Sequence, residues 1–232
     1  MMYQKIGIIV ATKMEIEPFL AHFPFKLIED KLWQFKNKDL NIHVLITGMG
    51  ILSTSANMTH YAMKNERDLF INVGIAGAFD RTIKLGEVLF VESETYGDFG
   101  VEDGDEFADF FDLGFLDKKE DEFQYGKRNS IGKIKNHKII SELRKVQSIT
   151  VNKVHGNPKT IDNLLKKYQP DIENMEGLAF YYVCNLLQID AIEIRSISNY
   201  VEKRNKENWD IKMAINNLNQ TLIEIVNSLQ ST

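Results

Sequence analysis

The sequence predicts an α/β fold with a central mixed, mostly parallel sheet flanked by helices, and two observations favour this class. Short, β-rich runs that are almost continuously apolar recur along the chain, as expected of strands covered on both faces. Between these runs, apolar residues recur at three- and four-residue spacing, which is typical of amphipathic helices. Their alternation predicts a largely parallel sheet with helices on both sides.

The size of the chain agrees with this fold class. It has 232 residues, of which 44% are hydrophobic, so it can bury a full core. This length suits one α/β domain, or at most two small ones, and we interpret residues 1–232 as a single domain. Strands are predicted at residues 6–11, 42–47, 69–73, 88–92, 172–174 and 191–198. Helices are predicted at residues 15–22, 51–64, 160–167, 176–187 and 211–229.

One segment, residues 98–122, departs from this alternation. It holds eleven acidic residues and two lysines, interleaved with five phenylalanines. The charges by themselves are typical of a solvated loop. The phenylalanines are too numerous for a disordered linker, so we expect a long loop that folds against a substrate pocket or a second subunit.

Composition excludes several classes of protein. The formal net charge of -5 argues against nonspecific nucleic-acid binding, which needs a basic face. No apolar run is long enough for a signal peptide or a membrane span. The single cysteine, Cys184, fits a reducing compartment, so we expect a cytoplasmic protein. The five histidines show no metal-ligand spacing, and no cofactor motif is complete.

Candidate site residues follow the predicted strands, because ligands of open α/β sheets bind beyond the carboxyl ends of strands. Glu15 and Glu176 each open a predicted helix, and each could simply be an acid that stabilises the helix N-terminus. Asn199 ends the last predicted strand and could be a turn residue. The glycines at 48 and 50, and those at 74 and 77, predict tight turns after two strands.

Five stretches of the chain together carry a family resemblance. In chain order they are residues 6–12 with Glu15, residues 47–50, residues 72–77, residues 174–177 and residues 195–199. Their order and spacing resemble the nucleoside phosphorylase and nucleosidase superfamily over nearly the whole chain. The resemblance implies a nucleoside phosphorylase-like fold, a small-molecule nucleoside substrate and no cofactor or metal. It also favours a homodimer.

Within this superfamily the chain is most similar to the futalosine hydrolase family, at residues 96–102, 197–205 and 208–211. That resemblance implies cleavage of futalosine to hypoxanthine and dehypoxanthinyl futalosine, a step of menaquinone biosynthesis. Nucleosidases of the methylthioadenosine type differ at two positions. They carry Ser where this chain has Ile75 and Asp where it has Asn199, so both departures count against an adenine-type substrate.

The resemblance implies a role for each matching residue. Glu15 would hold and deprotonate the attacking water, and Asn199 would bind the purine and stabilise the leaving base. Glu176 would accept hydrogen bonds from the ribose hydroxyls, with Met175 packed on the sugar. Further candidate contacts to the substrate are Gly50, Ile75 and Val154, with Tyr96, Phe99 and Trp209 considered for its 5′ side.

The nucleophile can be argued from the residues as well. A phosphorylase must hold a phosphate dianion, usually with arginines. Neither the turn at Glu15 nor the stretch from Gly74 to Asp80 contains an arginine, and Arg81 lies further on. Water is therefore the expected nucleophile. The alternatives are a methylthioadenosine/adenosylhomocysteine nucleosidase, a nucleoside-binding protein without turnover, and a generic acidic α/β binding domain.

Overall fold

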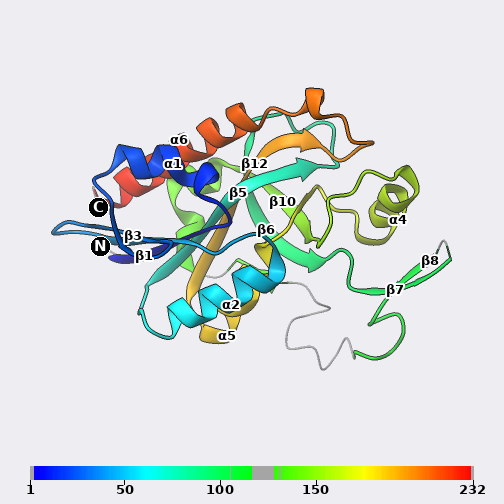
Figure 1. The fold of residues 1–232 in the computed structure, drawn as a ribbon, viewed down its shortest axis with the longest axis horizontal. Coiled ribbons are helices and arrows are strands. Elements are labelled where there is room, and N and C mark those ends of the chain that lie inside the picture. The colour runs from blue at the N-terminus through cyan, green and yellow to red at the C-terminus, as the bar shows by residue number, and fades with distance from the viewer. Residues whose placement is uncertain (1–2, 105, 117–127, 131, 231–232) are drawn as a thin grey trace.

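The computed structural model describes residues 3–104, 106–116, 128–130 and 132–230. Its centre is a ten-stranded mixed sheet with helices on both faces, and a separate two-stranded hairpin projects from one end (Figure 1). The strands are β1 (Lys5–Val10), β2 (Lys26–Glu29), β3 (Leu32–Lys36), β4 (Asn41–Ile46), β5 (Leu69–Ala78), β6 (Val88–Tyr96), β7 (Gly100–Asp103), β8 (Glu106–Asp109), β9 (Arg128–Asn129), β10 (Arg144–Thr150), β11 (Ile172–Asn174) and β12 (Asp190–Tyr200).

The longer helices are amphipathic or buried, as the apolar spacing predicts. They are α1 (Lys13–His22), α2 (Gly50–Ala62), α4 (Pro158–Tyr168), α5 (Gly177–Leu187) and α6 (Ile211–Gln230), with the short elements α3 (Lys138–Glu142), η1 (Lys133–Asn136) and η2 (Lys206–Asn208). The single-sheet α/β architecture with a mixed sheet flanked by helices confirms the predicted fold class.

Part of the sheet closes on itself. The strand order is β11-β10-β6-β12-β5-β1-β4-β3-β2, and β11 also pairs with β5. Strands β5, β12, β6, β10 and β11 therefore form a closed ring. The ring combines two antiparallel pairs, β12 with β6 and β11 with β5, and three parallel pairs, β12 with β5, β6 with β10 and β10 with β11. This ring brings together side chains from segments that are far apart in the sequence.

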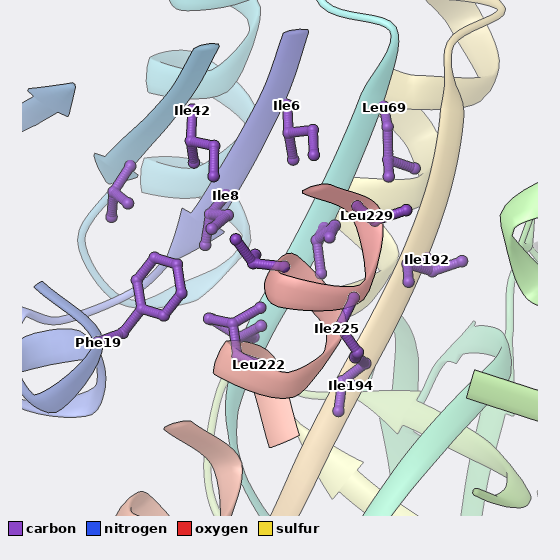
Figure 2. Packing of buried hydrophobic residues seen from close by; sticks show 14 of the residues in the cluster. Ile6, Ile8, Phe19, Ile42, Leu69, Ile192, Ile194, Leu222, Ile225 and Leu229 are labelled. Carbon is purple, nitrogen blue, oxygen red and sulfur yellow. The ribbon is translucent and has the colours of Figure 1, made fainter. Parts of the chain in front are cut away.

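Two apolar layers cover the two faces of the sheet. On one face, Phe19 of α1 and Leu222 and Ile225 of α6 pack on Ile8 of β1 and Ile194 of β12 (Figure 2). On the other face, α2 and α5 pack on β5, β6 and β12, as the ribbon shows (Figure 1). Alternating residues of the central strands therefore face different helices.

The prediction of a turn at residues 74–77 was wrong. Strand β5 continues through these residues to Ala78. Its two edges explain this, because β12 pairs along it as far as Tyr200 and β11 pairs with Gly77 and Ala78. Hydrogen bonds to both neighbours thus hold a glycine-rich stretch in an extended conformation. Strands β2, β3 and β10 were not predicted, because their residues are less uniformly apolar than those of the predicted strands.

The acidic segment with its phenylalanines folds against the rest of the chain, as predicted for its described part. Strands β7 and β8 form a hairpin. Oδ2 of Asp109, the last residue of β8, lies 3.0 Å from Nζ of Lys167 in α4. Asp98 accepts a 2.6 Å hydrogen bond from the backbone of Asn152. Residues 117–122 of the segment lie outside the described residues. No helix within the described part of the chain has the length and apolar character needed to cross a membrane.

Candidate active site

Glu15 uses its two carboxylate oxygens for different partners. Oε2 accepts hydrogen bonds from the backbone N–H of Thr12, at 3.1 Å, and from its hydroxyl, at 2.7 Å. This is a capping box that starts α1. Oε1 reaches across to β5 and accepts from the backbone N–H of Ile75 at 3.1 Å. The side chain therefore both caps its helix and is held against the central strand.

Glu176 does not cap its own helix, so the capping interpretation is wrong for this residue. That role belongs to Asn174, whose Oδ1 accepts from the backbone N–H groups of Glu176 and Gly177 at 2.9 and 2.8 Å. The Glu176 side chain, which is buried, therefore makes contacts away from α5. Its Oε1 accepts from the backbone N–H of Gly50 at 2.9 Å, and its Oε2 lies 3.7 Å from Nη1 of Arg195.

Arg195 is fully buried between these groups. Its Nε donates to Glu193 at 2.7 Å, and its Nη2 donates to Asn72 at 2.6 Å. It pairs in register with Gly74 of β5, where an added methyl group would overlap Nη1 and would lie 3.1 Å from Oε1 of Glu15. The absence of a side chain at position 74 thus allows an arginine and a carboxylate to meet over one point of the strand.

An arginine does lie near the Glu15 turn, although none is close to it in the sequence, because β12 brings Arg195 there. Its Nε and Nη2 donate to Glu193 and Asn72, and its Nη1 lies 3.7 Å from Glu176, so this buried arginine is surrounded by partners of the chain itself, whereas phosphate binding needs open donors. Arg81 pairs at the surface with Glu202 at 2.7 Å and lies over the ring of Tyr200. Neither arginine is arranged as a phosphate clamp in this structure.

Charge and burial act in opposite directions on Glu176. Burial raises its pKa, and the nearby charge of Glu15 raises it further. The guanidinium of Arg195 and the N–H of Gly50 lower it, because both stabilise the ionised form. The pKa of Arg195 itself is raised by the surrounding carboxylates despite its burial. The site therefore concentrates negative charge around a single buried cation.

Asn199 lies at the other end of the site, where β12 has an irregular register with Gly77. Its Oδ1 accepts a 2.8 Å hydrogen bond from Ser198, and its Nδ2 donates to the carbonyl of Tyr200 at 3.0 Å. These two bonds fix which atom of the amide points where. The backbone of Asp210 donates to the Ser198 carbonyl at 2.8 Å, which places half-buried Trp209 next to this strand end.

The remaining predicted contacts of the substrate are Val154, Tyr96, Phe99 and Met175. Val154 is 54% exposed and precedes His155, which is buried against Glu173 with Nδ1 2.8 Å from its Oε2. Tyr96 and Phe99 stack on each other with ring centroids 4.7 Å apart. Met175 is half-buried beside Glu176. Backbone N–H groups thus join Ile75 to Glu15 and Gly50 to Glu176, and the roles of all the predicted site residues stay predictions.

A cleft of about 770 Å³ opens beside this site, between the β7–β8 hairpin and α4. Asn152, His155 and Tyr168 contribute to its lining, but Glu15 and Glu176 do not. His155 connects the two places, because its partner Glu173 pairs in register with Gly77 of β5. The cleft is thus a neighbour of the carboxylate site rather than the site itself.

Sequence reasoning overlooked the buried polar residues around Arg195. Glu193 and Arg195 interrupt an otherwise apolar strand, and a buried charge must be paired. That interruption was the available signal. Their partners could not be identified from it, because Glu94, Asn174 and Asn72 come from three other strands.

The family assignment follows from comparison with known proteins. The model of the phosphorylase superfamily matches residues 5–230. The chain belongs to this superfamily. Among the relatives of this phosphorylase-superfamily chain is futalosine hydrolase of Thermus thermophilus, 28% identical over 209 residues that cover 89% of this chain and 88% of that one.

Two further relatives widen the comparison. A 5′-methylthioadenosine/S-adenosylhomocysteine nucleosidase of Buchnera aphidicola is 24% identical over 224 residues, which cover 92% of each chain. The structure of a futalosine hydrolase mutant of Helicobacter pylori superposes with a TM-score of 0.82 at 17% identity, over 97% of this chain and 99% of that one. Both kinds of relative are nucleosidases, which confirms the prediction of an N-glycosyl hydrolase at the level of enzyme class.

Proposed function

We propose that this chain hydrolyses the N-glycosidic bond of futalosine, releasing hypoxanthine and dehypoxanthinyl futalosine, and that it serves menaquinone biosynthesis. The observation that carries the choice of purine is the amide of Asn199, whose oxygen is fixed by a hydrogen bond from Ser198. The similarity to a futalosine hydrolase over most of both chains supports the same choice.

The ribose end has the charges that the reaction needs. Cleavage of an N-glycoside develops positive charge on the ribosyl ring, and a nearby carboxylate stabilises that charge. Glu176 is that carboxylate in our proposal, and it also accepts hydrogen bonds from the ribose hydroxyls. The N–H of Gly50 and the guanidinium of Arg195 hold its oxygens in place, so little reorganisation accompanies the reaction.

Glu15 positions and deprotonates the water. Its carboxylate is 6% exposed and faces Gly74, where no side chain separates it from Arg195 and Glu176. Thr12 and Ile75 fix both oxygens, and a fixed carboxylate can orient a weak nucleophile such as water. Oε1, which accepts one hydrogen bond, from Ile75, also keeps a lone pair for that water, since each carboxylate oxygen accepts more than one hydrogen bond.

The purine end stabilises negative charge on the leaving base. The amide of Asn199 offers a donor and an acceptor, which match O6 and the protonated N7 of a departing 6-oxopurine. The exposed Val154 and the half-buried Ile75 and Met175 provide apolar surface for the base and the sugar.

The test is incubation of the purified chain with futalosine, aminofutalosine, inosine and methylthioadenosine, followed by chromatography of the released base. We expect hypoxanthine from futalosine at the highest kcat/KM. The reaction should proceed without phosphate, and added phosphate should give no sugar 1-phosphate. Preferential release of adenine from methylthioadenosine would contradict the proposal, and so would strict dependence on phosphate.

The alternative is a methylthioadenosine/adenosylhomocysteine nucleosidase, which the Buchnera relative favours. Asn199 is the residue that separates the two, because an ionised Asp only accepts and suits the amino edge of adenine better. A nucleoside-binding protein without turnover would release no base from any of the four nucleosides.

We further propose that the chain acts as a homodimer in the cytoplasm on a small-molecule nucleoside, without nucleic-acid or membrane partners and without a cofactor or metal. The exposed aromatic residues of the hairpin segment, Phe99 and Phe115, support a protein contact there. Light scattering of the purified chain measures the oligomeric state, and a monomer under assay conditions would contradict the dimer.

A further inference from the structure

Behind the ribose carboxylate lies a second acidic pair that the proposed mechanism does not use. Glu94 of β6 and Glu193 of β12 are both fully buried. They face the same point at the start of α5, where a methyl group added at Gly177 would overlap an oxygen of Glu94 and both oxygens of Glu193. The two carboxyl groups are therefore immediate neighbours.

The hydrogen bonds around this pair are unequal. Glu193 Oε1 accepts from Arg195 at 2.7 Å and from Asn174 at 3.3 Å. Its Oε2 is buried with no hydrogen-bond partner among the described residues. Glu94 accepts from the Thr150 hydroxyl at 2.7 Å and from the amide of Asn174. Only a proton between the carboxyl groups would give Glu193 Oε2 a donor.

The charge balance demands that proton as well. Three buried carboxylates, those of Glu94, Glu193 and Glu176, surround the one guanidinium of Arg195. With all three ionised, one cation would face three anions in a buried site, which is strongly unfavourable. Burial raises the pKa of Glu94 well above its usual range, and the charge of Glu193 raises it further. Burial also raises the pKa of Glu193, but Arg195 opposes this.

The geometry points to a shared-proton pair in which Glu94 is the carboxylic acid, Glu193 is the carboxylate, and the pair positions Arg195 against the ribose carboxylate Glu176. Glu94 donates its proton to Oε2 of Glu193, and the ionised Glu193 holds Nε of Arg195. The guanidinium then directs Nη1 at Glu176. The pair is thus a positioning device, and its catalytic consequence rests on the proposed role of Glu176.

The retained proton also sets the charge beneath the sugar. With Glu94 neutral, the buried group formed by Glu94, Glu193, Glu176 and Arg195 carries one net negative charge. A ribosyl cation would offset that charge, and the carboxylate of Glu15 remains as a further negative charge beside Glu176. The other titratable side chain that faces the pair is Tyr181 of α5, and burial and the two glutamates raise its pKa well above the usual value, so it stays uncharged.

Two substitutions distinguish the members of the pair. Glu94→Gln mimics the protonated acid, because its amide N–H can donate to Glu193 while its oxygen accepts from the Thr150 hydroxyl. The Asn174 amide loses its bond to residue 94 but keeps those to Ser148 and Glu193. We expect kcat/KM within about threefold of wild type. Glu193→Gln removes the anion that holds Nε of Arg195, and we expect a loss of at least tenfold, the scale of one charged hydrogen bond. Equal losses in the two variants would overturn the assignment.

A pH profile tests the positioning role, which mere loss of stability would not mimic. Arg195 lowers the pKa of Glu176, so a guanidinium that Glu193 no longer holds would stabilise the ionised Glu176 less. In the double variant Glu94→Gln/Glu193→Gln, the acid limb of kcat/KM should therefore move to higher pH. In Glu94→Gln it should stay in place, because the charge of Glu193 is retained. An unmoved limb in the double variant would contradict the role in positioning.

The proton itself can be observed without any substrate. The infrared spectrum of the free wild-type protein at neutral pH should show the C=O band of a buried protonated carboxylic acid, and Glu94→Gln should lack it. A wild-type protein without that band would overturn the shared-proton pair. If the band is present but no purine nucleoside is cleaved, the pair stands and the proposed function fails.

Discussion

The two ends of the candidate site are built by different means. At the ribose end, Glu15, Glu176 and Arg195 are each buried and each held by backbone N–H groups or charged partners. At the proposed purine end, the group that we expect to read the base is the neutral amide of Asn199, which is held by Ser198 and the Tyr200 carbonyl.

This difference indicates which end can vary. Glu176 pairs with Arg195, and Glu15 accepts from Thr12 and the N–H of Ile75, so a substitution of either carboxylate leaves a buried partner unpaired, which is costly. The amide at the purine end is held by one serine and one carbonyl, and its replacement disturbs fewer neighbours. We therefore expect the ribose end to control rate and the purine end to control the choice of substrate.

The largest effect is expected from Glu15→Gln. Turnover should fall by at least ~100-fold, the lower range for the loss of a positioned general base, while substrate binding changes little. Glu17→Gln is the matched control, because that residue is on the same helix, is exposed and pairs only with Lys13. Near-normal turnover in Glu15→Gln would mean that the carboxylate only caps α1. Kinetics with saturating futalosine decide between these outcomes.

Glu176→Gln should lower kcat/KM by roughly 100-fold, the scale of one electrostatic group that stabilises a transition-state charge. Both KM and kcat should worsen, because the ribose contacts act in the ground state and strengthen as the ring becomes cationic. Unchanged kinetics with a lower melting temperature would assign Glu176 a structural role. Steady-state kinetics and thermal unfolding of the same preparation separate these cases.

The pH dependence follows from the same residue. Only the ionised form of Glu176 can stabilise the ribosyl cation, and burial raises its pKa. Activity should therefore be present above that raised pKa and fall as the pH drops through it, starting at a higher pH than for an exposed glutamate. The acid limb of kcat/KM is the measurement, and a limb at the position of an exposed glutamate would contradict the assignment.

Asn199→Asp tests the purine end. A carboxylate would face O6 of the 6-oxopurine, and such mispairing costs ~1–3 kcal/mol. We expect futalosine cleavage to fall by roughly tenfold to a hundredfold on that scale, with a shift of preference toward aminofutalosine. The loss of the bond to the Tyr200 carbonyl affects both substrates, so the ratio of their kcat/KM values is the measurement. A ratio that stays constant would mean that Asn199 does not read the base.

Ser198→Ala should have the smallest effect. Its hydroxyl donates to Oδ1 of Asn199 at 2.8 Å, and the loss of one neutral hydrogen bond costs about 1 kcal/mol, which is about fivefold in kcat/KM. The control is Ser141→Ala, since Ser141 is exposed and its hydroxyl bonds only to the backbone of Lys138. A larger loss than in Asn199→Asp would reverse the expected order at the purine end.

Much of the fold could be predicted from local pattern. The strand predicted at 6–11 covers β1 except for Lys5, and the helix predicted at 211–229 ends one residue before α6 does. These elements are uniformly apolar or strongly periodic, so their own residues determine them. Strands β2 and β10 were missed because many of their residues are exposed and polar, and only pairing with a neighbour makes them strands.

The sequence by itself determined the alternation of strands and helices, the family resemblance and the identity of Glu15, Glu176 and Asn199 as candidates. Only the tertiary structure decided what surrounds them. It continued β5 through Gly74, brought Arg195 to the carboxylates and placed Glu94 against Glu193. The physical reason is that local pattern follows backbone hydrogen bonding and burial within one segment, whereas buried charges find their partners on other strands only after the ring of strands has closed.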